Sequence, residues 1–518
     1  MVAAPRRRHA RTLVLACLVA LLLLVPAASR NAPGVAAAPN PFAGSPWYDD
    51  PDNPIKGQAD AWRQSRPGDA ALLDTVAHEQ YADWFGSWFG NATTTDFANR
   101  RVTQIAATGA VPIIVAYNIP NLNCWRGNGS ANAATYAAWV DALARGIGNR
   151  KVAILVEPDG LTVTECLSVA QRNERFAMVH AAVRRFKQNP LATVYIDGGD
   201  DVRNTPDEIV AILQAAGVGD ADGFSLNVTV YQFATAEVAY GHDVATRLGG
   251  KHFVVDTSRD GHGQPGGVWC NARTAAIGLR PTANTGDPLA DAFLWVKPIW
   301  QSDNTCDRGD PAAGANFFDY TLLLVRNSLA MFTDLPADPT DARQINDLAR
   351  LGVVRGNGDG TVGTDAQVLR AQMAALIARP FALEFEDDGT PFADRGAIDP
   401  ALWRNVGALA QHGIARGYGD GTFNPTGPVL EVQVISFIAR GMVARGTWQP
   451  ATADNPALYP DVPASSGARL DLLTYRANTG AIPSRPENGG WSSWARPATR
   501  GWFVQAEWQA LDPLYHFR

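Results

Sequence analysis

The sequence predicts an α/β fold: a parallel sheet, open or closed into a barrel, followed by helical repeats. Two observations predict it. Between residues 40 and 331, short apolar runs alternate with longer stretches in which apolar residues recur at helical spacing. Past residue 331, segments of about 60 residues echo one another. Alternating strands and helices are typical of a parallel sheet, and repeats of this length indicate modules that pack copy on copy.

The first 38 residues have the layout of a secretory signal peptide. A basic segment between Arg6 and Arg11 precedes the apolar run LVLACLVALLLLVPAA, and small residues follow it. The alternative is a transmembrane anchor, but a span needs about 20 apolar residues and this run is shorter. We therefore expect residues 1–38 to be a cleaved signal and the mature protein to be secreted. No later stretch of the sequence is long and apolar enough to span a membrane.

The composition is that of a folded, mildly acidic protein. Hydrophobic residues make up 46% and charged residues 18% of the chain, and the net charge is −7, which argues against disorder and against nucleic acid as a partner. Beyond the signal segment the cysteines are Cys124, Cys166, Cys270 and Cys306. An even number in an exported chain favours disulfides over free thiols. The residues alone leave all pairings open, and two sequential loops are the simplest.

Six apolar runs are predicted to form buried strands, at residues 111–117, 152–156, 192–196, 223–228, 252–255 and 292–296. The segments between them, such as 131–147 and 171–189, have helical spacing. Polar residues fall at or just past the C-terminal end of each run, namely Tyr117, Asn118, Glu157, Asp159, Asp197, Asn227, Asp256 and Lys297. In a β/α barrel these strand ends meet on one face, where active sites are built. We therefore expect the functional site there.

The C-terminal part is organised as three related segments, at residues 332–391, 392–458 and, in a degenerate form that includes the C-terminal tail, 459–518. The first two have an aromatic-x-Asp opening, a predicted helix, a Gly-Asp-Gly turn and a second predicted helix. The Gly-Asp-Gly turns suggest calcium at first sight. However, the spaced acidic ligands and closing Glu of an EF-hand loop are missing. A tight turn is the better interpretation.

Several separated motifs between residues 40 and 331 resemble glycoside hydrolase family 6. They are NPFAG, VAYNIPNLNC, ILVEPDGL, VYIDGGD, GFSLNVT, HFVVDTSRDG, WCN and AFLWVKPIWQSD, in this order. The resemblance implies a distorted, TIM-like β/α barrel of about seven strands. It implies an inverting cellulase that acts on β-1,4-glucan, disulfides Cys124–Cys166 and Cys270–Cys306, and neither metal nor cofactor.

The resemblance also implies catalytic roles for individual residues. Asp159 of EPDG matches the general acid, which must stay protonated near neutral pH. Asp303 of QSDNTC matches the carboxylate on the base side or in charge stabilisation. Asp197 of YIDGG matches an auxiliary acid, and Lys297 and Tyr117 match groups that hold the sugar and its water.

The expected substrate-binding residues combine aromatic platforms with polar contacts. Aromatic faces stack on the apolar faces of pyranose rings, although each Trp could equally serve core packing. The set comprises Trp47, Trp269 and Trp300 as platforms, with Asn123, Asn227, Lys297 and Gln301 as polar contacts.

The chain departs from the family pattern near the expected site. Asn123 stands where the family has an Asp that tunes the acid, and Asp200 and Arg203 replace a His and a Trp. Gln301 replaces a Glu, and Trp300 a Gly. Losing a proton carrier costs about 10²–10⁴ in rate. These changes therefore leave reduced activity, a new glucan preference or glucan binding without turnover as open alternatives.

The C-terminal copies resemble S-layer homology (SLH) repeats, which hold exported bacterial proteins to cell-wall polysaccharide. Their usual Thr-Arg-Ala-Glu-like motif is VLRAQ in the first copy, which keeps Arg370, and VLEVQ in the second, which lacks the Arg. The alternative is a structural or protein-binding appendage. We therefore predict a secreted, inverting, endo-acting β-1,4-glucanase tethered to the cell wall, with a catalytically impaired, surface glucan-binding protein as the alternative.

Overall fold

The computed structural model describes residues 39–517, with internal gaps at 123, 125–128, 264–266, 330, 382, 384–390, 460–461, 464–466 and 483–495. The predicted signal peptide and the candidate residue Asn123 lie outside the described residues. Among the described residues, no helix has the length and apolarity of a membrane-spanning segment.

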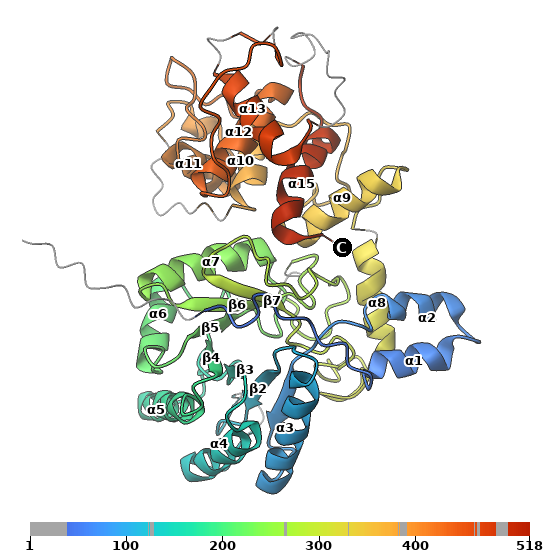
Figure 1. Cartoon of the computed structure of the whole chain (residues 1–518), viewed down its shortest axis with the longest axis vertical. Helices are drawn as coiled ribbons and strands as arrows, with labels where there is room; N and C mark the ends of the chain where they lie inside the picture. The colour runs from blue at the N-terminus through green and yellow to red at the C-terminus, as the bar shows by residue number, and fades with distance from the viewer. Residues whose placement is uncertain are drawn as a thin grey trace, which may run out of the picture. The chain divides into compact units, whose positions relative to one another are not determined.

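Seven parallel strands pair in chain order to form one curled sheet, and Figure 1 labels β2 to β7 among them. They are β1 (Asp83–Gly86), β2 (Ile113–Tyr117), β3 (Val152–Val156), β4 (Ala192–Asp197), β5 (Gly223–Leu226), β6 (His252–Asp256) and β7 (Ala290–Leu294). An isolated parallel bridge joins Tyr81, just before β1, to Trp295, just after β7. The two edges of the sheet therefore meet, which confirms the predicted distorted β/α barrel. β1 was absent from the sequence prediction.

Helices connect the strands and cover the outside of the sheet (Figure 1). They are α3 (Asn91–Ala106), α4 (Ala133–Ile147), α5 (Val169–Phe186), α6 (Pro206–Ala215) and α7 (Ala234–Arg247), with α1 (Pro54–Trp62) and α2 (Pro67–Asp74) before β1 and α8 (Phe318–Leu329) after β7. Asn132, Ser168 and Thr205 cap α4, α5 and α6, each accepting a hydrogen bond from the N–H three residues later. These caps satisfy N–H groups that a helix start otherwise leaves unpaired.

The strands are apolar on both faces because each face contributes to a different part of the core. On β3, Ile154 packs in the layer beneath the helices, whereas Leu155 packs in the barrel interior. Leu155 pairs in register with Val115 of β2 and Tyr195 of β4, which belong to the same interior layer. Such two-sided burial explains why the sequence shows continuous apolar runs here.

The predicted disulfides Cys124–Cys166 and Cys270–Cys306 are both formed. Free thiols, the alternative left open by the sequence, are therefore wrong for these four residues. Each bridge closes a loop beyond the C-terminal ends of the strands: the first joins the loops after β2 and β3, and the second joins the β6–β7 connection to the loop after β7. Such cross-links restrict the loops that surround the expected site.

The C-terminal part is helical, as predicted. Its elements are α9 (Pro339–Arg350), α10 (Arg370–Ala378), η1 (Arg395–Ala397), η2 (Pro400–Leu402), α11 (Trp403–Gln411), α12 (Glu431–Ala444), α13 (Ala468–Thr479) and α15 (Arg500–Tyr515). The first two Gly-Asp-Gly segments are tight turns: Asp359 accepts hydrogen bonds from Thr361, and Asp420 accepts them from Thr422.

Three equivalent segments of the repeats hydrogen-bond to one another in a ring. The N–H of Val368 donates to the Ala498 carbonyl (3.0 Å), that of Val429 to the Val368 carbonyl (2.9 Å), and that of Ala498 to the Val429 carbonyl (2.8 Å). Each segment immediately precedes a helix, α10, α12 or α15. The degenerate third segment thus takes the same place in this ring as the first two.

Candidate active site

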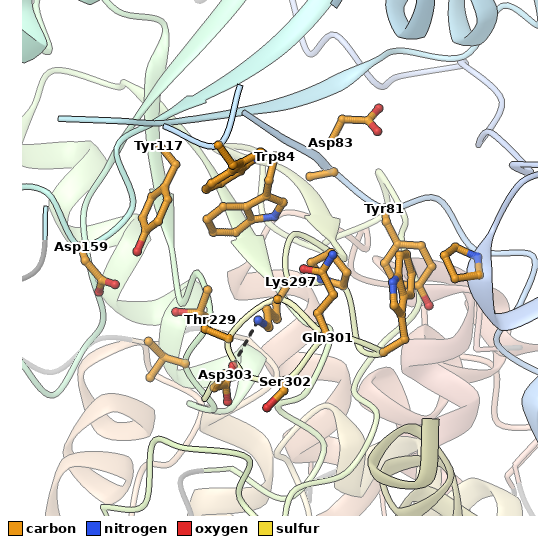
Figure 2. A pocket seen from close by; sticks show the side chains of 18 of the residues that line it. Tyr81, Asp83, Trp84, Tyr117, Asp159, Thr229, Lys297, Gln301, Ser302 and Asp303 are labelled. Carbon is orange, nitrogen blue, oxygen red and sulfur yellow. Dashed lines mark ion pairs between the residues drawn. The ribbon is translucent and has the colours of Figure 1, made fainter. Parts of the chain in front are cut away.

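A cleft of about 1760 Å³ opens at the C-terminal ends of the strands. It brings together most of the residues that the sequence predicted for the site, namely Tyr117, Asp159, Trp269, Lys297, Trp300, Gln301 and Asp303. Figure 2 shows that the side chains of Tyr117 at the end of β2, Asp159 after β3, and Lys297 and Asp303 after β7 converge on this cleft. Parallel strands produce this convergence because their C-terminal ends share one edge of the sheet.

The two carboxylates that follow β3 have different tasks. Glu157 is fully buried, and its side chain accepts hydrogen bonds from the backbone N–H groups of Asn118 (2.9 Å) and Ile119 (3.0 Å). Burial raises its pKa to about 7. Glu157 therefore fixes the loop after β2. Asp159 instead lines the cleft, in a turn where both residues have positive φ, +56° for Glu157 and +65° for Asp159.

The surroundings of Asp159 favour its protonated form. Burial raises the pKa of Asp159 most, the positive charge of Arg203 opposes this, and the negative charges of Asp200 and Asp303 raise the pKa further. Beneath it lies Asp197, only 2% exposed, whose Oδ2 accepts a hydrogen bond from the backbone N–H of Asp159 (3.2 Å). Burial, and then the charge of Asp159, raise the pKa of Asp197 well above its usual value.

Asp303, in contrast to Asp159, is held in its ionised form by neighbouring cations. Arg259 Nη1 donates to both carboxylate oxygens (2.8 and 2.9 Å), and Lys297 Nζ lies 3.2 Å from Oδ1 (Figure 2). The Tyr231 hydroxyl (3.2 Å) and the backbone N–H of Asn271 (2.9 Å) donate to Oδ2. Burial alone would raise the pKa of Asp303, but the two cations outweigh it and hold the pKa at about 2. Asp303 is therefore ionised.

One cleft thus contains a carboxyl group whose pKa is raised, Asp159, and a carboxylate whose pKa is lowered to about 2, Asp303. Environments that separate two pKa values in this way mark an acid and its charged counterpart. The pairing of Asp159 with Asp303 suits a reaction in which a proton is given to a leaving group while positive charge develops nearby.

Aromatic side chains supply the apolar surfaces of the cleft. Trp269 is 65% exposed and Trp88 is 54% exposed, and both line the cleft. Trp84 lies edge-on to Tyr117, with ring centroids 5.1 Å apart, and its Nε1 donates to a main-chain carbonyl. Trp300 also lines the cleft but is largely buried. Trp269 and Trp88 are therefore the open faces on which a sugar ring can stack.

Two predicted substrate-binding residues lie outside the cleft lining. Trp47 stacks on Phe42, with ring centroids 5.8 Å apart. Asn227 is fully buried: its Nδ2 donates to the carbonyls of Gln232 and Asp256, both at 2.9 Å, and its Oδ1 accepts from the Gln232 N–H. Trp47 thus packs on Phe42 and Asn227 supports the loop after β5, and their contact with substrate stays a prediction.

The sequence interpretation missed several residues of the site. Arg259 belongs to the quoted HFVVDTSRDG segment, yet its role depends on a salt bridge to a residue 44 positions away. Tyr231, Trp84 and Trp88 had no distinguishing pattern. An arginine that is 1% exposed is rare unless paired, but sequence alone does not report its burial.

The loop after β4 holds the substituted positions Asp200 and Arg203. Asp200 is 4% exposed, and its Oδ1 accepts the backbone N–H groups of Val202 (3.1 Å) and Arg203 (2.9 Å). Arg203 Nε lies 3.6 Å from Asp200 Oδ2, and both residues line the cleft. A buried carboxylate and a partly exposed guanidinium thus lie as a pair in the cleft wall. Within the described part of the chain, no group of His, Cys, Asp or Glu side chains has the arrangement of a metal site.

Comparison with known proteins identifies the family. Residues 42–328 match the model of glycosyl hydrolases family 6, and residues 332–374 and 391–430 match the S-layer homology domain. Endoglucanase 1 of Streptomyces halstedii is 35% identical over 312 residues, which is 58% of this chain and 94% of the relative. Endoglucanase A of Thermobispora bispora is 35% identical over 269 residues, and the match spans 50% of this chain but only 58% of the relative.

A solved structure agrees with these matches. The endoglucanase Cel6 from Mycobacterium tuberculosis, solved in complex with methyl-cellobiosyl-4-deoxy-4-thio-β-D-cellobioside, is 37% identical. It aligns with a TM-score of 0.53 over 56% of this chain and 99% of that structure. The family model covers more than half of the chain, over the barrel and its cleft. The chain therefore belongs to glycosyl hydrolases family 6.

Proposed function

We propose that the chain is a β-1,4-glucanase that hydrolyses cellulose or a related β-glucan with inversion at the anomeric carbon. The observation that carries this proposal is that one cleft contains both Asp159, whose pKa is raised by burial, and Asp303, which Arg259 and Lys297 hold ionised. Exposed Trp faces in the same cleft suit a sugar chain. Two of the relatives are named endoglucanases, and these names support the substrate class.

In the proposed mechanism Asp159 donates its proton to the glycosidic oxygen as the bond to the anomeric carbon breaks. Positive charge develops on the sugar ring, and a water attacks the anomeric carbon from the opposite face, forming the new C–O bond and passing its proton to a second water of the cleft. A carboxylate with a pKa of about 2 is a poor base, so we assign Asp303 to charge stabilisation of this transition state. Lys297 and Tyr117, which line the cleft beside these acids, orient the sugar and the water.

We propose that cleavage occurs within glucan chains. A cleft of this volume has room for several sugar rings, whereas a typical small-molecule pocket has about 300–1,000 Å³. The test is hydrolysis of a soluble cellulose derivative. Endo action predicts that the viscosity falls steeply while few reducing ends have formed. A slow fall in viscosity with release of short sugars would indicate action from chain ends instead.

We further propose that the mature protein is secreted and held at the bacterial surface by its S-layer homology segments. Arg370 is the residue that the first copy keeps from the repeat signature, and its side chain is 4% exposed. Its guanidinium lies 5.0 Å from the ring centroid of Tyr418 and 4.9 Å from that of Phe423, both in the second copy, so Arg370 joins the two copies. Co-sedimentation of the full chain with purified cell-wall polysaccharide tests this proposal. Recovery of all protein in the supernatant would favour a structural appendage.

A second candidate function is glucan binding without turnover. It is favoured by Gln301, an amide in the cleft where the family has a carboxylate, and by Asn123 in the sequence. This candidate predicts that cello-oligosaccharides bind and remain intact. Turnover by the wild-type chain would exclude it.

A further inference from the structure

The first repeat contacts the barrel at the beginning of α7. The Leu351 carbonyl accepts a hydrogen bond from the backbone N–H of Thr235 (3.2 Å). Gly352 packs directly on Phe233, the N-cap residue of α7, since a Cβ atom added at Gly352 would lie 2.6 Å from Phe233 Cβ. The Arg355 guanidinium lies over the Phe233 ring, 4.8 Å from its centroid. The turn after α9 therefore docks on the N-terminus of α7.

The first turn of α7 in turn holds the loop that follows β4. Glu237 of α7 is fully buried, and its Oε1 accepts a hydrogen bond from the backbone N–H of Asp201 (3.1 Å). The preceding residue, Asp200, accepts the backbone N–H groups of Val202 and Arg203. Asp200, Val202 and Arg203 all line the cleft. The loop is thus held to α7 by the Asp201–Glu237 hydrogen bond, and its other three residues face the cleft.

Charged side chains of the first repeat, the loop after β4 and α7 also lie close enough to affect one another. Burial raises the pKa of Asp201, and the positive charge of Arg355 lowers it. Burial, followed by the charges of Asp201 and Asp200, raises the pKa of Glu237 well above its usual value. The first repeat therefore places a cation beside half-buried Asp201, which hydrogen-bonds to buried Glu237. Because Arg355 is exposed, this charge contributes little energy by itself, and the packing of Gly352 on Phe233 is the stronger contact.

We propose that the first repeat is a positioning element of the cleft: by docking on the start of α7, it holds the Asp200–Arg203 loop in place. The repeats are then more than a tether, because the cleft wall depends on their docking. The expected loss of turnover on undocking rests on the proposed glucanase function. The expected loosening of the Asp200–Arg203 loop does not. Small displacements of residues that orient a substrate can cost up to about 10² in rate.

The internal repeat provides a matched control. Gly352 and Gly413 occupy equivalent positions in the first and second copies, and both have positive φ, +85° and +67°. An alanine is therefore strained at either position. Only at Gly352 does the new Cβ meet the barrel, because a Cβ at Gly413 has no atom within 4 Å. Comparing Gly352→Ala with Gly413→Ala therefore isolates the docking contact from the backbone strain.

The test is hydrogen–deuterium exchange of the amides of residues 198–204 in the full chain. The proposal predicts that Gly352→Ala speeds exchange of these amides about tenfold relative to Gly413→Ala, at comparable melting temperatures. Arg355→Ala is compared with Arg416→Ala at the equivalent position of the second copy. It is expected to speed exchange of the same amides by a smaller factor, and it removes a contact without inserting an extra atom between the repeat and the barrel. Equal exchange in this segment for both members of each pair would overturn the proposal.

Turnover is measured on the same variants with a soluble cello-oligosaccharide. The docking variants are expected to have kcat/KM about five- to tenfold below that of their second-copy controls. Faster loop exchange with unchanged kcat/KM would also overturn the positioning role. If the wild-type chain has no turnover, the proposed function fails, and the exchange comparison alone then decides whether the repeat holds the loop.

Discussion

The backbone N–H of Asp159 donates a hydrogen bond to Oδ2 of Asp197 across 3.2 Å. This contact ties the turn after β3 to the end of β4 and places a second buried carboxyl beneath the proposed proton donor. Burial raises the pKa of both groups, and the charge of Asp159 raises that of Asp197 further. The pair therefore retains protons at pH values at which an exposed aspartate is ionised. The predictions below follow from this arrangement and from its ionised counterpart, Asp303.

The pH dependence of hydrolysis should have one dominant limb. As the pH rises through the raised pKa of Asp159, the acid loses its proton and kcat/KM should fall. Asp303, with a pKa of about 2, stays ionised at all pH values above that, so it should produce no loss on the acidic side while the chain remains folded. A pH profile of kcat/KM measures this, and a rate that climbs with pH through neutrality would contradict it.

Asp200→Asn and Arg203→Gln should move the alkaline limb in opposite directions. The negative charge of Asp200 raises the pKa of Asp159, so its removal should shift the limb to lower pH. The positive charge of Arg203 lowers that pKa, so its removal should shift the limb to higher pH. Because Arg203 is partly exposed, solvent screens its charge, and we expect its removal to produce a small shift. Asp207→Asn, on the surface of α6, is the control and should leave the profile unchanged.

Arg259→Met should impair both stability and turnover. It removes the main cation from buried Asp303, and leaving a buried charge short of its partner costs about 3–5 kcal/mol. The pKa of Asp303 should rise, so a new acidic limb should accompany a loss of about 10² or more in kcat/KM. Urea unfolding and the pH profile measure the two effects. A loss of stability without a new acidic limb would mean that Arg259 is only structural.

Trp269→Ala should weaken substrate binding with little effect on folding. Its ring is 65% exposed in the cleft, so removal takes away a stacking surface but leaves no cavity in the core. We expect KM to rise about tenfold with a nearly unchanged melting temperature. Trp47→Ala is the comparison: its ring packs on Phe42 outside the cleft lining, so it should lower the melting temperature and leave KM unchanged. A rise in KM for Trp47→Ala would instead support its predicted role as a sugar platform.

The sequence was most informative where one physical constraint dominates. Strands β2 to β6 are buried on both faces and therefore appear as apolar runs. Strand β1 was not predicted because its four residues, DWFG, begin with Asp83 and end with a glycine, so they form no apolar run. Strand β7 was predicted, but it begins two residues earlier than expected. Polar residues at strand ends located the cleft, since parallel strands share their C-terminal edge.

Contacts between segments far apart in the chain could not be predicted from the sequence. The cation that neutralises Asp303 could not be assigned to Arg259 without the fold, and the hydrogen bonds that occupy Asn227 could not be foreseen. The docking of Gly352 on Phe233 joins two modules that sequence patterns describe separately. Such contacts depend on how elements pack, which local periodicity does not encode.

The most direct test of this account is the anomeric form of the first product released from cellotetraose, followed by proton magnetic resonance for the wild-type chain and for Asp159→Asn. The account predicts that the wild type releases the α-anomer, since a water attacks the face opposite the leaving group, and that Asp159→Asn releases product at least about 10² more slowly. Release of the β-anomer, or turnover undiminished in Asp159→Asn, would contradict it.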